Sequence, residues 1–431
     1  MGVISVREYA KLTTSVCDNS LDQHQISASA FDWLCELHGR LSSAGANLLR
    51  VDNRNWLCLN SLVGVVQTPC GTTLEILPKT YSDKAGLGAS RSLLRKMVLA
   101  LLDLPAKEAN EAAVARFDMP LTEWVMKRFV ERLQELVNQG LRFDYVRFED
   151  ELPFLRGQLN TTALMRQPIT RAHLFHVRHD VLVPNRPENR LLRLALDCVR
   201  KSTRQQETWR IANELAHRMG DIPASVNEAS DWYAWSNSRL MTHYQSIHPW
   251  CELVLSKSMP LALMGQTQGM SLLFPMEKLF ENYVARCLRR QLSSDYTLVI
   301  QPRRHYLATH NYRNMFRLEP DLLIEHRESD SVWALDTKWK RLFGDAEQGK
   351  NYGILQSDMY QMLAYGNTYL KGKGSLYLVY PSWDGFQLAL PHFDLPSDIR
   401  LEVVPFNMDE DRMVAVESLD EFFGNFNVED F

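Results

Sequence analysis

The sequence lacks the cysteine pattern of a disulfide framework or a zinc ribbon. Its seven cysteines are scattered over 431 residues, their number is odd, and no two of them form a CxxC pair. Such usage argues against both kinds of cross-link and for a reducing compartment. The sequence also contains no secretory signal and no apolar run long enough to span a bilayer. We therefore expect a cytoplasmic protein without a membrane partner.

An overall positive charge is absent as well. The formal net charge is −4 and the sequence pI is about 6.3, so any contact with nucleic acid must come from a local cluster or a partner. One cluster of arginines lies in the middle of the chain. Its members could contact phosphates, or they could be ordinary surface residues that are solvated or salt-bridged. They are Arg142, Arg147, Arg156, Arg166, Arg171, Arg178, Arg186 and Arg190.

Two apparent ligand motifs fail on residue type or spacing. The segment Gly344–Lys350 (GDAEQGK) matches the first seven positions of a P-loop, but Asn351 replaces the required Ser or Thr and no apolar strand precedes it. We interpret it as a loop and expect no nucleotide hydrolysis by this chain. His173, His176 and His179 are spaced by three, which on a strand directs neighbouring side chains to opposite faces. We therefore expect no metal site there.

The length and the pattern of apolar residues predict a multi-domain α/β protein. Residues 1–105 alternate between strand-like and helix-like segments, and we interpret them as an α/β module for folding or partner binding. Residues 106–270 are predicted to be mainly helical, as in Pro120–Gln139, where apolar residues recur at helical spacing. Residues 271–431 contain the remaining patterns that carry chemistry.

Residues 319–340 (EPDLLIEHRESDSVWALDTKWK) hold the most informative of these patterns. Two apolar runs are separated by the polar segment RESDS, which predicts a β-hairpin. With the turn centred near Glu328–Ser329, Asp321 and Asp336 lie opposite one another, with Cβ atoms about 4.5–5.5 Å apart. Lys338 is two residues beyond Asp336 and points to the same face. The hairpin thus predicts two carboxylates and one lysine at one place.

Such a cluster opposes folding unless it has a purpose, because two neighbouring carboxylates raise one another's pKa. A divalent cation such as Mg²⁺ relieves the repulsion, since hard cations prefer carboxylate oxygen. A lysine beside a metal-bound water can orient it or assist its deprotonation. Together these groups are the apparatus of metal-assisted phosphodiester hydrolysis. The alternative interpretation is an edge hairpin with solvated charges at its ends.

The segments on either side of the hairpin extend the pattern. Phe274–Leu292 predicts an amphipathic helix, with Glu277 and Glu281 one turn apart beside its apolar stripe. Either glutamate could reach towards the metal or remain a solvated edge charge. After the hairpin, ILQSDMYQMLAYGNTYL predicts a helix on which Gln361 and Tyr365 share a face, and SLYLVY predicts a strand.

This order of elements resembles the PD-(D/E)xK nuclease superfamily, with Pro320–Asp321 and Asp336-Thr337-Lys338 in the signature positions. The closer resemblance is to the McrC family, the nuclease subunits of McrBC-type modification-dependent restriction systems. The segments EPDLLI, ALDTKWK, SDMYQMLAY and LYLVYP occur in the order of that family. Upstream, LRGQL, HDVLVPNRPENRLL and LEILPK are similar to it as well.

The resemblance implies a nuclease core in the C-terminal region, with a mixed central sheet flanked by helices. It also implies Mg²⁺ as the cofactor, with Mn²⁺ as a substitute. The implied metal ligands are Asp321, Asp336 and Glu281, with Glu277 as a rival for the position of Glu281. Lys338 would serve the attacking water.

On the helix after the hairpin, Gln361 and Tyr365 would position DNA or the lysine. The family further implies an McrB-like AAA+ GTPase hexamer that recognises modified, methylated double-stranded DNA and activates cleavage. Residues 1–105 would dock on that ring and the chain would stimulate its GTP hydrolysis, while residues 106–270 would supply possible DNA contacts. Two alternatives stay open: a stand-alone repair or recombination nuclease, and a non-cleaving adaptor that regulates an AAA+ ring.

Overall fold

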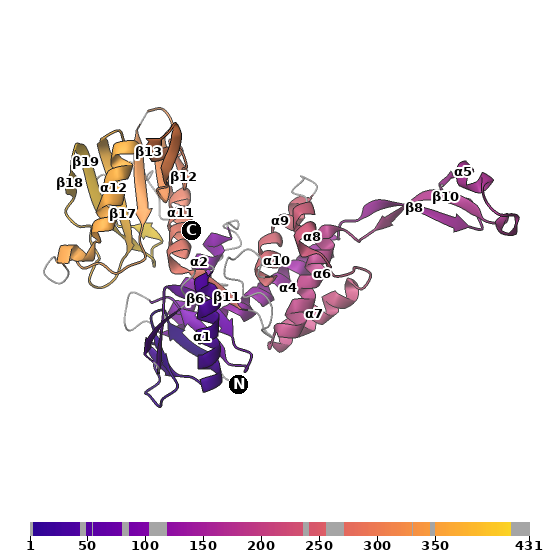
Figure 1. Ribbon diagram of the computed structural model, residues 1–431, viewed down its shortest axis with the longest axis horizontal. Helices are drawn as coiled ribbons and strands as arrows, with labels where there is room; N and C mark the ends of the chain where they lie inside the picture. Colours follow the sequence, from indigo (N-terminus) through magenta and orange to yellow (C-terminus); the bar gives the residue numbers. More distant parts are fainter. Residues whose placement is uncertain are drawn as a thin grey trace. The chain divides into compact units, whose positions relative to one another are not determined.

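The computed structural model describes residues 3–43, 49–53, 55–79, 86–102, 119–235, 241–255, 271–329, 331–344 and 350–414 (Figure 1). The chain forms two units, one of Met1–Asp118 with Leu273–Phe431 and the other of Met119–Leu272. The predicted regions 1–105 and 271–431 therefore lie within the same unit. Among the described residues, no helix is long and apolar enough to cross a membrane.

The N-terminal part of the first unit contains two four-stranded sheets. One has the strand order β1–β7–β6–β11 and the other the order β3–β2–β5–β4. This mixture of strands and helices is the one predicted for residues 1–105. The elements are β1 Val3–Arg7, β2 Lys11–Thr13, β3 Gln23–Gln25, α1 Ala28–Ser43, β4 Leu49–Asn53, β5 Trp56–Leu59, β6 Leu62–Gln67, β7 Thr73–Leu77, α2 Leu87–Leu101 and β11 Leu272–Pro275.

The C-terminal part of the first unit is built on a seven-stranded mixed sheet, as predicted. Its order is β12–β15–β16–β17–β19–β18, with β20 also paired to β19. β16, β17 and β19 run parallel, and the other pairs are antiparallel. The elements are α11 Met276–Gln291, β12 Tyr296–Ile300, β13 His305–His310, β14 Arg313–Leu318, β15 Leu322–His326, β16 Val332–Thr337, η4 Lys350–Gly353, α12 Gln356–Thr368, β17 Lys373–Pro381, β18 Phe393–Leu395, β19 Asp398–Asn407 and β20 Arg412–Met413.

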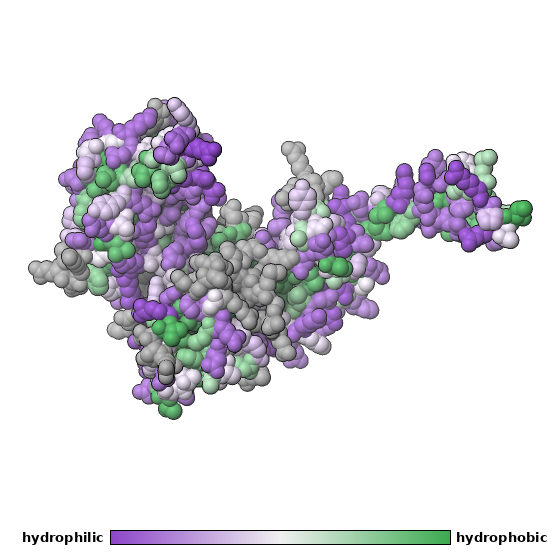
Figure 2. All heavy atoms as spheres, viewed as in Figure 1, coloured by the Kyte–Doolittle hydropathy of each residue, from purple (hydrophilic) through white to green (hydrophobic). Residues whose placement is uncertain are grey.

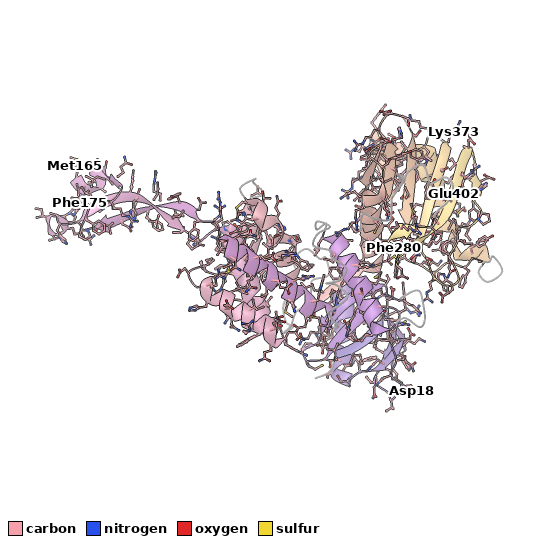
Figure 3. All side chains as sticks on the ribbon, turned by 180° about the vertical axis from the view of Figure 1, so that it is seen from behind. Asp18, Met165, Phe175, Phe280, Lys373 and Glu402 are labelled. Atoms are coloured by element: carbon pink, nitrogen blue, oxygen red, sulfur yellow. The ribbon has the colours of Figure 1, made fainter. Side chains whose placement is uncertain are left out.

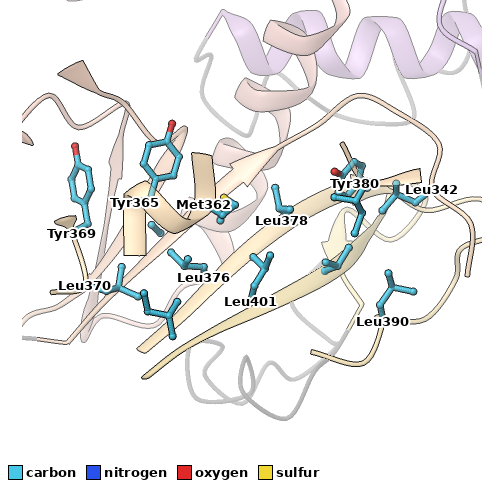
Figure 4. Close-up of a cluster of buried hydrophobic side chains, with 14 of the residues drawn as sticks. Leu342, Met362, Tyr365, Tyr369, Leu370, Leu376, Leu378, Tyr380, Leu390 and Leu401 are labelled. Carbon is cyan, nitrogen blue, oxygen red and sulfur yellow. The ribbon is translucent and has the colours of Figure 1, made fainter. Parts of the chain in front are cut away.

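Helix α12 packs on this sheet through a buried apolar cluster. Figure 4 shows Met362 and Tyr365 of α12 above Leu376 and Leu378 of β17. The helix approaches the sheet closely at Gly366, where an added Cβ atom would lie 2.7 Å from a side-chain carbon of Ile399. Burial of these leucines stabilises the layer by roughly 1.5–3 kcal/mol per side chain. The packing therefore fixes which face of α12 is turned towards the sheet.

The second unit contains the predicted helices and also a three-stranded sheet, β8–β10–β9, within the region predicted to be mainly helical. β8 and β10 pair over nine residues as an antiparallel ladder, which we call the arm (Figure 1). Met165 and Phe175 lie at the end of the arm away from the helices of this unit (Figure 3). The elements are α4 Leu121–Gln139, β8 Asp144–Leu152, β9 Gln158–Leu159, α5 Thr161–Met165, η2 Ile169–Arg171, β10 Phe175–Val183, α6 Pro187–Ser202, α7 Gln206–Arg218, α8 Glu228–Ala234, α9 Thr242–Gln245 and α10 His248–Val254.

The two failed ligand motifs can now be placed. His176 and His179 lie on β10, three residues apart and so on opposite faces, while His173 precedes the strand. Throughout the part of the chain that the structure describes, no group of three His, Cys, Asp or Glu side chains is arranged to hold a metal ion as it stands. Most of the P-loop-like segment, residues 345–349, lies outside the described residues.

Candidate active site

The β15–β16 hairpin has the predicted register. Leu322 lies opposite Leu335, so the next pair in the same register is Asp321 and Asp336. Leu322 and Leu335 are fully buried, and a slip of one residue would turn every apolar side chain of the strand to the wrong face. Burial of the strand thus determines the placement of the two carboxylates.

Asp336 is the most buried acid of the cluster, with a relative exposure of 1%. Its Oδ1 accepts a hydrogen bond from Nε2 of Gln361 at 3.3 Å. Its Oδ2 forms an ion pair with Nζ of Lys338 at 2.6 Å. Burial raises the pKa of Asp336 to about 7, and the negative charge of Asp321 adds to this effect. Asp336 is therefore a carboxylate that lacks sufficient positive charge around it.

Lys338 lies directly beyond β16, where its backbone NH continues the parallel ladder to the carbonyl of Val379 at 2.9 Å. Its Nζ donates to Oε1 of Gln361 at 3.0 Å and lies 4.0 Å from Oδ1 of Asp358. Burial lowers the pKa of this ammonium group, but the charges of the neighbouring acids outweigh burial and raise the pKa of Lys338 overall. The site thus holds one lysine among several carboxylates.

The structure separates the two glutamates that the sequence left as rivals. Glu281 is 4% exposed, and its Oε1 accepts from Nε2 of Gln301 at 2.6 Å. Gln301 in turn donates its backbone NH to the carbonyl of Asp321 at 2.8 Å. Burial, and then the charge of Asp321, raise the pKa of Glu281. Glu277 is exposed and instead accepts from Oγ of Ser61 at 2.7 Å in the N-terminal part. Glu281 therefore faces the cluster, and Glu277 does not.

The remaining predicted residues lie together on α12. Gln361 bridges the cluster, because its Oε1 accepts from Lys338 while its Nε2 lies 3.3 Å from Asp336 and 2.7 Å from the hydroxyl of Tyr365. The hydroxyl of Tyr365 donates to the carbonyl of Glu319 at 3.0 Å, just before Asp321. All six sequence-predicted residues thus belong to one connected set of contacts.

The donor set has the chemistry that a divalent cation prefers, although no three acids of the described residues are arranged to hold a metal ion as the side chains stand. Asp336 and Glu281 are both buried, and the charge of Asp321 raises the pKa of each. Asp321 thus repels both of the other carboxylates, and oxygen ligands of this kind are the ones that Mg²⁺ prefers. In the structure, two ammonium groups partly neutralise the negative charge of these carboxylates. Lys338 lies beside Asp336, and Nζ of Lys278 donates to Glu281 at 2.6 Å.

One further residue at the site and one contact near it were missed from the sequence. Asp358, in the first turn of α12, is 8% exposed and approaches Lys338. Glu8 is 1% exposed, and its Oε1 accepts from Nε1 of Trp339 at 2.8 Å, although the two are 331 residues apart. The ring of Trp339 also lies 5.3 Å from that of Phe280, the residue before Glu281. Only Asp358 had a local signal, since it lies in the segment SDMYQMLAY.

Comparisons with known proteins bear on the family and on the fold of the chain. A family model described as "McrBC 5-methylcytosine restriction system component" matches residues 57–381. The fold is similar to a chain of a solved structure described as "Refined half-complex from tetradecameric assembly of Thermococcus gammatolerans McrB AAA+ hexamers with bound McrC". That match covers 97% of this chain and 98% of the other, with a TM-score of 0.71 and 16% identity.

A second similar chain comes from the "Cryo-EM structure of the Thermococcus gammatolerans McrBC complex". It covers 67% of this chain and 88% of its own length, with a TM-score of 0.53 and 18% identity. No curated protein matches the chain. At these identities the solved structures show a shared fold, whereas the family model spans more than half of the sequence. The chain therefore belongs to the family of McrBC 5-methylcytosine restriction system components.

Proposed function

We propose that this chain is the Mg²⁺-dependent DNA endonuclease subunit of a restriction complex. The observation that supports the proposal best is the contact of Lys338 with Asp336 at the end of β16, in a register that brings Asp321 opposite Asp336. A lone hairpin with charged ends would expose these groups to water, but Asp336 is almost fully buried. Burying such a group without a compensating partner is costly, which favours a functional role.

The residues of the chain divide the work as follows. Asp321, Asp336 and Glu281 would hold the metal ion, and Lys338 would place a positive charge and three N–H donors beside a phosphate or water oxygen. Gln361 holds Nζ of Lys338 by a 3.0 Å hydrogen bond. Gln361 in turn donates a hydrogen bond to the hydroxyl of Tyr365, so these two side chains of α12 position the lysine. When bound, Mg²⁺ would supply Lewis-acid polarisation of the phosphodiester.

The partner we propose is an McrB-like AAA+ GTPase hexamer, which the chain would bind and whose GTP hydrolysis it would stimulate. Two observations support this: the family match and the similarity to chains from complexes described as McrB with bound McrC. The name of the family also supports double-stranded DNA with modified cytosine as the substrate. In that arrangement the ring would select the DNA and this chain would cut it in the cytoplasm.

The test is the substitution Asp336→Asn in the full-length chain, assayed with the partner ring, GTP, Mg²⁺ and methylated duplex DNA. We expect cleavage to be abolished while co-purification with the ring and GTPase stimulation persist. The matched control is Asp398→Asn, an aspartate at the start of β19 in the same sheet whose side chain is 80% exposed. It should cleave as the wild type does.

Three results would contradict the proposal. Full cleavage by Asp336→Asn would show that this site does not catalyse DNA cleavage. Wild-type protein that stimulates the ring but never cuts would favour the adaptor. Efficient cutting of unmodified DNA without partner or GTP would favour a stand-alone repair nuclease.

A further inference from the structure

The β13–β14 hairpin, residues His305–Leu318, stands apart from the seven-stranded sheet although it is inserted at the candidate active site. Its two strands pair only with each other in the described structure. The chain enters it after Gln301, which contacts Glu281, and leaves it just before Asp321. The base of the hairpin therefore lies beside the carboxylate cluster.

The base of the hairpin is fastened to the helix that braces Lys338. The hydroxyl of Tyr369 lies 2.9 Å from the carbonyl oxygen of Pro302, where the chain enters the hairpin, and 2.8 Å from that of Leu318, where the chain leaves it. The ring of His305 also packs on the ring of Tyr369, with 4.6 Å between centroids. In Figure 4 the hydroxyls of Tyr365 and Tyr369 point the same way from α12. The hairpin thus has a defined position relative to the site.

The charge of this segment is of one sign. Residues 302–318 contain four arginines, two histidines and no acid, in a chain whose net charge is −4. Near the base, Arg303 and Arg317 share Glu319, and Arg304 pairs with Glu325. Arg313, at the tip, is exposed and forms no ion pair within the described residues. The hairpin therefore has a surplus of positive charge next to a site that has a surplus of negative charge.

The outer side chains are also unusual for a free surface. Tyr312 at the turn is fully exposed, Phe316 is 69% exposed and Leu307 is 60% exposed. Hydrophilic and hydrophobic side chains lie side by side on the surface over β13 (Figure 2). An isolated two-stranded hairpin is only marginally stable in water. A two-stranded ribbon also has the width that the major groove of DNA admits.

We propose that the β13–β14 hairpin binds the phosphate backbone of duplex DNA beside the point of cleavage, with Arg313 and Tyr312 at its tip touching the DNA. This inference rests on the proposed nuclease function, because it assumes that DNA reaches the carboxylate cluster. The hairpin supplies the positive charge that the cluster itself lacks, so it holds the polyanion against a site that would otherwise repel it.

The test uses the full-length chain with its partner ring and two readouts. The first is equilibrium binding to a short methylated duplex, with Ca²⁺ in place of Mg²⁺, at several salt concentrations. The second is cleavage in Mg²⁺, with KM and kcat determined separately. The variants are Arg313→Ala and Arg313→Glu. The matched control is Arg400→Ala on β19, an exposed arginine for which the described residues also show no ion pair.

We expect Arg313→Ala to weaken binding about threefold and Arg313→Glu about tenfold at low salt, with KM rising in parallel and kcat within about twofold. The slope of log binding constant against log salt should fall by about one for each phosphate that the variant no longer neutralises. Arg400→Ala should match the wild type. An unchanged melting temperature would exclude misfolding as the cause.

Unchanged binding, KM and salt slope in both Arg313 variants would overturn the inference. So would a loss of ring binding or GTPase stimulation with DNA binding intact, which would assign the hairpin to a protein interface. If the wild type binds DNA through Arg313 but never cleaves it, the hairpin assignment holds and the nuclease proposal fails.

Discussion

The arm of the second unit and the C-terminal part of the first unit use charge in opposite ways. Residues 144–183 of the arm hold five arginines and five acids, which sum to zero, whereas residues 302–318 hold four arginines and no acid. On the arm the charges pair across the ladder, as in Arg147 with Asp180 and Arg178 with Glu149. Charge is therefore balanced within the arm, whereas three arginines of residues 302–318 share Glu319 and Glu325 and leave a positive surplus that includes Arg313.

This difference bears on the basic cluster expected between residues 142 and 190. At least five of its eight arginines form ion pairs in the structure, which supports the salt-bridged alternative for these residues. They are Arg147, Arg171, Arg178, Arg186 and Arg190. A count of arginines along a sequence thus measures positive potential poorly, because what matters is whether acids lie within a few ångströms.

The largest effect should come from the segregated negative site. We expect Lys338→Ala to lower kcat for DNA cleavage by about 100- to 1,000-fold, because it removes the positive charge nearest the buried Asp336. Lys373→Ala is the control: this lysine also forms an ion pair with an aspartate, but its side chain is 81% exposed. Equal activity of the two variants in the cleavage assay would show that segregation of charge at the site is not functional.

The next largest effect compares the β13–β14 hairpin with the arm. Arg313→Glu should raise the KM for DNA about tenfold, whereas Arg178→Glu on the arm should leave it unchanged, since Arg178 is already neutralised by Glu149 at 2.7 Å. KM values at two salt concentrations would measure the contrast. An equal rise in KM for both substitutions would contradict the proposed difference between the hairpin and the arm.

The buried acid Glu8, unlike the exposed acids of the arm, predicts that stability depends on pH. Burial raises the pKa of Glu8 from 4.5 to about 7, against its hydrogen bonds from Lys79 and Trp339. Between these values the folded protein holds a proton that the unfolded chain has released, so stability falls as pH rises from 4.5 to 7. Above pH 7 both forms are ionised and the loss of stability is complete.

We therefore expect Glu8→Gln to be more stable than the wild type at pH 8, on the order of 1–3 kcal/mol, and close to it at pH 4. Melting temperatures at the two pH values would measure this. The exposed Glu149→Gln on the arm should change stability little at either pH. A Glu8→Gln variant that is less stable at pH 8 would show that the carboxylate is needed in its ionised form.

The smallest effect is expected on the arm. Arg147 and Asp180 are paired in register at 3.2 Å, and both are about half exposed or more. Exchanging them in the double variant Arg147→Asp/Asp180→Arg should leave stability within about 0.5 kcal/mol, whereas Arg147→Asp alone sets two like charges opposite each other and should cost about 0.2–1 kcal/mol. Chemical denaturation of the three proteins would decide this. A costly double exchange would mean that the arm's charges are as specific as those of the site.

Much of the candidate site could be predicted because its pattern is local. The register of Asp321 and Asp336 follows from the length of one turn and the burial of one strand. The shared face of Gln361 and Tyr365 follows from helical spacing. The β13–β14 hairpin was not predicted; in the structure Asn311 and Tyr312 both have positive φ, as in a type I′ turn, and of the two only Asn is a residue type that such turns favour.

The choice between Glu277 and Glu281 could not be made from the sequence. Both lie on one flank of α11, and their environments differ only because Ser61 of one segment and Gln301 of another reach different turns of that helix. The hydrogen bond between Glu8 and Trp339 had no signal at all. No periodicity connects two residues that are brought together only when the segment after β1 meets the segment after β16.

The sequence by itself determined the grouping of the candidate site: which acids and which lysine meet on one hairpin, and which helix contacts them. Those relations depend on the strand period of two and the helix period of 3.6, which act over short stretches. Tertiary structure alone decided which carboxylates are buried and which charges lack a counter-ion. Burial and neutralisation are set by whatever packs alongside a residue, and at Glu8, Glu281 and Arg313 those neighbours, or their absence within the described residues, are not apparent from the local sequence.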